Sequence, residues 1–120
     1  MTSAPNQEQL REAQELLSLS TDALYQDLGE RIGERGLPED LIRAGRARYR
    51  AVTEKCRSAI CGNDTIRVLS TDKTADKATA LVLAIADTIL HTMGVPVPAM
   101  TVAAILVQSG LETFCKAQWS

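Results

Sequence analysis

The chain has 120 residues, of which 45% are apolar and 23% are charged, and its formal net charge at pH 7 is −2. This composition excludes a disordered chain and suffices for one domain whose core needs neither a metal nor a disulfide. A charge so close to zero does not indicate a nucleic-acid partner. We expect a flexible N-terminus at residues 1–6 and a single helical domain over 7–120.

The first two helices are predicted from apolar spacing and capping residues. Apolar side chains recur at helical spacing from Leu10 to Leu17, which predicts a surface helix over residues 7–17. After a break, Ser20 or Thr21 suits the N-cap because its hydroxyl can accept from an unpaired amide. The second helix is expected to weaken at Gly29 and to end by Gly36, a residue type common just past a helix end.

The remaining elements follow from prolines and turn residues. Pro38 is well placed in the first turn of a third helix that reaches about Ile60. Residues 65–69 (TIRVL) are the one stretch that resembles a strand, and without a partner they predict an extended connection. A fourth helix is expected over about 73–93, and a fifth over about 98–117 with a weak point at Gly110.

The 34 residues between Lys77 and Glu112 contain one formal charge, Asp87. A helix that is apolar all round is either the centre of a bundle or a membrane span. Each arm offers only about 13 to 15 apolar positions, whereas a span needs about 20. We therefore predict an all-α fold, a single compact bundle of about five helices with an apolar hairpin (73–117) at its centre. A membrane-associated hairpin is kept as the alternative.

Charge is strongly segregated along the chain. Residues 1–40 carry a net charge of −6, whereas residues 41–60 carry +5. The simplest interpretation is that the acidic first part packs beside the basic third helix, so that their charges pair. The functional interpretation is a basic helix face that docks on an acidic protein surface. The residues predicted for that partner are Arg43, Arg46, Arg50 and Arg57, with Trp119 as either a core cap or an anchor.

The three cysteines, Cys56, Cys61 and Cys115, lack the paired short spacing of zinc sites. No metal or cofactor is predicted. The odd count and the absence of a secretory segment at the start predict free thiols and a cytoplasmic address.

Catalytic motifs are missing, including phosphate-binding glycine loops and a GxSxG turn. Asp87 and His91 are four residues apart and share one helix face, which would suit acid–base chemistry, so a small enzyme remains a further alternative. The favoured hypothesis is a non-enzymatic module for protein–protein interaction: an adaptor, a regulator or a small subunit. It acts through helix faces, and a homo-oligomer is one form that it can take.

Overall fold

The structure, a computed structural model, describes residues 7–71 and 77–119, and the described chain is all-α. Its helices are α1 (Gln7–Leu17), α2 (Thr21–Arg31), α3 (Pro38–Cys61), α4 (Asp64–Thr71), α5 (Lys77–Met93), α6 (Ala99–Ser109), α7 (Leu111–Phe114) and α8 (Lys116–Trp119). The flexible N-terminus predicted at 1–6 and the start predicted at residue 73 for the fourth helix lie outside the described residues.

The all-α prediction is confirmed, but the described chain has eight helices where about five were expected. Residues 65–69 were predicted as an extended connection and instead lie within α4. The Asn63 side chain explains the difference, because its Oδ1 accepts from the Ile66 amide at 3.0 Å and so caps the first turn. The last predicted helix is divided at Gly110, whose φ of 110° a continuous helix cannot contain.

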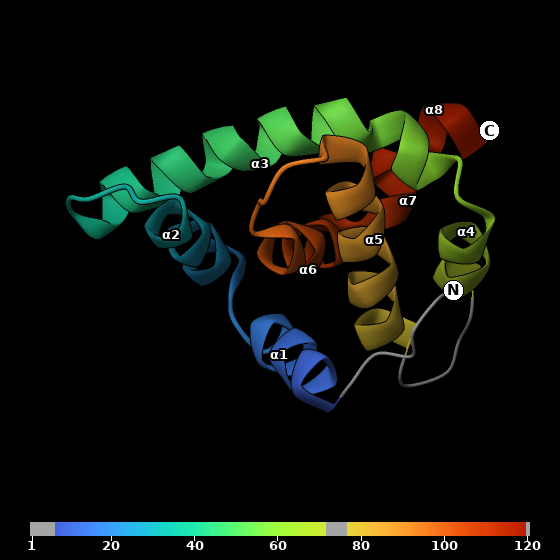
Figure 1. Ribbon diagram of the computed structural model, residues 1–120, viewed down its shortest axis with the longest axis horizontal. Helices are drawn as coiled ribbons and strands as arrows, with labels where there is room; N and C mark the ends of the chain where they lie inside the picture. Colours follow the sequence, from blue (N-terminus) through green and yellow to red (C-terminus); the bar gives the residue numbers. More distant parts are fainter. Residues whose placement is uncertain (1–6, 72–76, 120) are drawn as a thin grey trace.

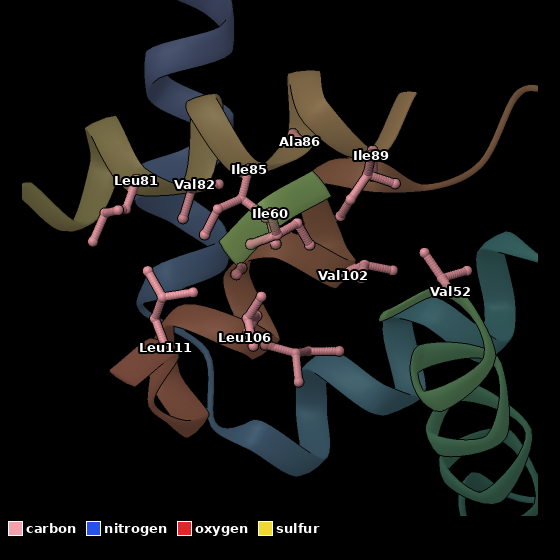
Figure 2. Close-up of a cluster of buried hydrophobic side chains, with 14 of the residues drawn as sticks. Val52, Ile60, Leu81, Val82, Ile85, Ala86, Ile89, Val102, Leu106 and Leu111 are labelled. Atoms are coloured by element: carbon pink, nitrogen blue, oxygen red, sulfur yellow. The ribbon is translucent and has the colours of Figure 1, made fainter. Parts of the chain in front are cut away.

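The centre of the fold is α6, in which every residue from Thr101 to Leu106 is buried. It packs against α1, α2, α3 and α5. Figure 1 shows α5 crossing α6 steeply, so the two apolar helices pack together without forming a side-by-side antiparallel hairpin. In Figure 2 the α5 side chains Val82, Ile85 and Ile89 gather on the side that faces Ile60 and Val102. The buried core side chains are mostly aliphatic.

α2 and α3 form the most closely packed pair of helices, and two glycines permit this approach. A Cβ on Gly45 would lie 2.8 Å from the carbonyl carbon of Tyr25 and closer still to its oxygen. A Cβ on Gly29 would meet the carbonyl of Leu41 in the same way. These residues therefore act as contact points between two helix backbones, and Gly29 is more than the weak helix position that was expected there.

The connection between α1 and α2 is held to α6 by one side chain, that of Gln108. Its Nε2 donates to the carbonyl oxygens of Leu17 and Leu19 at 3.1 and 2.7 Å, and its Oε1 accepts from Thr21 at 3.3 Å. Leu17 ends α1 and Leu19 lies in the turn after it, where carbonyl oxygens lack helical partners. Gln108 thus replaces those partners and fixes the angle between α1 and α2.

Replacing Gln108 with alanine is expected to lower the free energy of unfolding by about 1 kcal/mol, since water can solvate the exposed carbonyls left behind. Urea unfolding monitored by circular dichroism measures the change. Gln26→Ala, which removes a hydrogen bond to Glu30 within α2, is the control and should change stability by less than about 0.5 kcal/mol. Equal effects of the two replacements would contradict the bridging role of Gln108.

The cysteine prediction is wrong for two of the three residues. Cys61, at the end of α3, forms a disulfide with Cys115, and both side chains are buried. Cys56 is a buried free thiol. The pair spans 54 positions of sequence, so no short spacing announces it. The argument from free thiols to a cytoplasmic address therefore does not hold.

Within residues 7–71 and 77–119, no helix combines the length and the apolar character that crossing a membrane requires.

Candidate interaction surface on α3

The predicted arginines share one side of α3. Positions 43, 46, 50 and 57 lie within an arc of about 60° when each residue turns the helix by roughly 100°. α3 forms one long edge of the molecule (Figure 1), and its buried side faces α2 and α5. Arg43, Arg46 and Arg50 are exposed. We call these three residues the arginine stripe.

The acids near the arginine stripe neutralise it weakly. Nη1 of Arg43 lies 3.9 Å from Oδ1 of Asp40, and 81% of the Arg43 side chain is exposed. Nη2 of Arg46 lies 4.0 Å from Oδ1 of Asp22 on α2, which is the upper limit of distance for an ion pair. Arg50 has no ion-pair partner within the described ranges. Exposed pairs at such distances contribute little and exchange readily for other carboxylates.

The pairing expected between the acidic second helix and the basic third helix is therefore slight. Asp22 with Arg46 is the one ion pair that links α2 to α3 in the described part of the chain. Asp27, the other central acid of α2, accepts from Arg31 at 2.6 Å and from Thr101 at 3.0 Å. The Asp27 carboxylate is therefore engaged within α2 and with α6, and it does not neutralise the arginine stripe.

Arg46 also lies over an aromatic pair that supports this end of α3. Its guanidinium carbon is 5.2 Å from the centre of the Tyr25 ring, within the range of a cation–π contact. Tyr25 in turn meets Tyr49 edge to face, with ring centres 5.7 Å apart. This contact limits the freedom of Arg46, whereas Arg43 and Arg50 have no comparable restraint among the described aromatic contacts.

Burial raises the pKa of Tyr49 to about 12, and the neighbouring Tyr25 adds to the increase. The unfolded chain ionises Tyr49 near pH 10 while the folded chain still keeps its proton. The stabilising effect is complete below pH 10 and is lost as pH rises toward 12, by up to roughly 2 kcal/mol after allowance for partial exposure. Unfolding by urea at pH 8 and pH 11 should show this fall, and Tyr49→Phe should reduce it. An equal fall in the variant would assign the alkaline loss to other groups.

Arg57, predicted as the fourth binding arginine, is engaged within the chain. Its Nη1 donates to the backbone oxygen of Phe114, and its Nη2 donates to Glu54 at 2.6 Å. The guanidinium carbon of Arg57 also lies 4.0 Å from the centre of the Phe114 ring. These contacts attach the C-terminal segment to α3.

Trp119 takes part in the same attachment. Its indole Nε1 donates to the backbone oxygen of Cys61 at 2.7 Å, and the side chain is half-buried against the core. The guanidinium carbon of Arg67, on α4, lies 5.8 Å from the centre of the Trp119 ring. The contacts agree with the role of core cap, which was one of the two alternatives for this residue.

Asp87 and His91 lie on α5 and are both exposed. No hydrogen bond or ion pair joins them in the described chain, and no group of three candidate metal ligands occurs there. Neither residue lines either of two shallow depressions, of about 340 and 240 Å³, on the described surface.

Comparisons of the chain with models of protein families, with curated proteins and with solved structures find no match.

Proposed function

We propose that this chain is a non-enzymatic interaction module, an adaptor, regulator or small subunit, that binds an acidic protein surface through the arginine stripe. The observation that carries the proposal is the exposed positive charge of Arg43, Arg46 and Arg50, which the chain's own acids leave largely unpaired. The remainder of the chain is acidic, so this basic face is a local exception.

A protein partner fits this surface better than a nucleic acid does. Single-stranded nucleic acids need aromatic platforms for base stacking, and Tyr25 and Tyr49 are instead packed between helices. The sequence pI of about 5.4 also opposes general attraction to phosphates. Carboxylates on a protein can pair with guanidinium groups in two-point contacts that add geometric selectivity.

The test uses a double charge reversal, Arg43→Glu with Arg50→Glu, and a fluorescently labelled oligoglutamate peptide as the probe. Binding measured by fluorescence anisotropy should weaken roughly tenfold, because two attractive contacts become repulsive. Raising the salt concentration should weaken binding by the wild-type chain. Circular dichroism should show an unchanged helical fold, since both side chains are exposed.

Arg11→Glu with Arg35→Glu is the matched control. It changes the net charge equally at two exposed arginines outside α3. Its effect on binding should stay below about twofold, as expected for screened charges at a distance. An equal loss in both double variants would show that the peptide senses only overall charge, and unfolding of Arg43→Glu with Arg50→Glu would assign these arginines to structure.

A further inference from the structure

Three adjacent contacts attach the C-terminal segment, residues 111–119, to the end of α3. They are the disulfide between Cys61 and Cys115, the bond from Arg57 to the Phe114 oxygen, and the bond from Trp119 to the Cys61 oxygen. We call these three contacts the C-terminal clasp. It includes Arg57, which lies on the same side of α3 as the arginine stripe but closer than Arg50 to the end of the helix.

Besides the clasp, the half-buried side chains of Phe114 and Trp119 pack on the core, and Arg67 lies over the Trp119 ring. α7 and α8 have four residues each, far fewer than a helix needs for stability in isolation. Leu111 is the buried residue of α7, α8 has none, and Cys115 between them is the other buried side chain of the segment. Leu111 adjoins α6, so it anchors only the near end. Among the described contacts, the disulfide is the covalent one that ties residues 114–119 to α3.

We propose, on the basis of the function proposed above, that the disulfide is a redox-controlled clasp that withholds Arg57 from the partner surface. In the oxidised chain Arg57 is bound to Phe114, and the binding surface consists of the arginine stripe alone. Once the disulfide is reduced, residues 114–119 detach, and Arg57 keeps only its exposed ion pair with Glu54, which can exchange for a carboxylate of the partner. The length of the basic surface along the helix then increases from about 10 Å (Arg43 to Arg50) to about 21 Å (Arg43 to Arg57), at 1.5 Å per residue.

The reaction needs a dithiol reductant, such as a thioredoxin-class protein or dithiothreitol. A thiolate of the reductant attacks one sulfur of the Cys61–Cys115 bond and forms a mixed disulfide, while the other sulfur leaves and takes a proton. The second reductant thiol then displaces the remaining protein sulfur, which is protonated in turn. Two electrons pass to the protein, giving two thiols, and the reductant becomes a disulfide.

Access to the sulfurs depends on local opening. Cys61 and Cys115 are only 3% and 1% exposed, so attack requires residues 114–119 to open, and segments with few buried contacts open most easily. The third cysteine does not compete, because burial raises the pKa of the Cys56 thiol and lowers its reactive fraction.

The test compares oligoglutamate binding by the oxidised and the dithiothreitol-reduced chain. Reduction should tighten binding by the wild-type chain about threefold, the effect of one additional exposed ion pair. Arg57→Gln should show no such gain on reduction. Cys115→Ser should bind as the reduced wild-type chain does, with or without reductant. A gain that persists in Arg57→Gln would overturn the role of this arginine.

Trp119 supplies a second readout that does not depend on the partner, because it is the single tryptophan of the chain. Its emission should shift to longer wavelength on reduction, and Cys115→Ser should show the shifted spectrum at once. An unchanged spectrum after the thiols have been counted as reduced would overturn the clasp, as would a general loss of helical circular dichroism. A shift without tighter binding would overturn the control of Arg57. Absence of oligoglutamate binding in every form would instead refute the proposed function, and the control of binding with it.

Discussion

Replacing Gly45 with alanine is expected to destabilise the fold by at least about 3 kcal/mol, at the upper end of the range for single substitutions. The added methyl group would lie 2.8 Å from the Tyr25 carbonyl carbon and 3.2 Å from the Gly29 amide nitrogen. These are backbone atoms, so no side-chain rotation can relieve the clash. α2 and α3 would have to separate along their whole contact. Urea unfolding followed by circular dichroism measures the loss.

Gly33→Ala distinguishes this clash from the general cost of removing a glycine. Gly33 has a φ of 85°, and a Cβ there would meet no atom within 4 Å. Its replacement should cost about 1 to 2 kcal/mol from backbone strain alone. If Gly45→Ala cost no more than Gly33→Ala, the close approach of α2 and α3 would be contradicted.

Removing the disulfide with Cys61→Ser and Cys115→Ser together is the second large expected effect, a loss of roughly 4 kcal/mol. The bond closes a loop of 54 positions, and restricting the unfolded chain by a loop of that length accounts for the estimate. The far-UV circular dichroism of the folded variant should stay helical, because α7 and α8 are short. Thermal and urea unfolding provide the measurement.

Cys56→Ala serves as the control for replacing a buried cysteine, with an expected loss of about 1 kcal/mol from the small cavity. Thiol titration of the denatured wild-type chain adds a direct check. It should give one reactive thiol, that of Cys56. Three reactive thiols in freshly purified protein, or a double variant as stable as the wild type, would contradict the bond between Cys61 and Cys115.

Local signals predicted much of the helical order. Ser20 does cap α2, accepting from the Ala23 amide at 3.1 Å, and Pro38 does open α3. The stretch between Lys77 and Glu112 with its single charge does contain a buried helix, since α6 is buried from Thr101 to Leu106. These features depend on neighbours in sequence, so the sequence alone could reveal them.

The errors arose where a residue acts at a distance or has two roles. Residues 65–69 were expected to be extended, yet the Asn63 side chain caps them as the start of α4. The sequence marks Gly29 only as a weak helix position, because the Leu41 carbonyl that it contacts lies on another helix. The disulfide joins residues 54 positions apart, and nothing local marks them as a pair.

On the candidate surface, too, placement along one helix was predictable from the sequence, whereas contacts between distant residues were not. The spacing of Arg43, Arg46 and Arg50 was enough to place them on one side of a helix, because helical periodicity alone decides that. The engagement of Arg57 with Phe114 could not be predicted, since it depends on where the C-terminal segment folds back. Tyr25 beneath Arg46 was missed for the same reason, although its aromatic ring is a common neighbour of arginine.

The most direct test of the arginine stripe as the binding surface is an NMR titration of the oxidised chain with the oligoglutamate peptide. The Nε–Hε signals of Arg43, Arg46 and Arg50 should shift together and saturably, while those of Arg11 and Arg35 stay in place. The Arg57 signal should move only after reduction. Shifts spread evenly over all arginines, or confined to residues outside α3, would contradict the proposed surface.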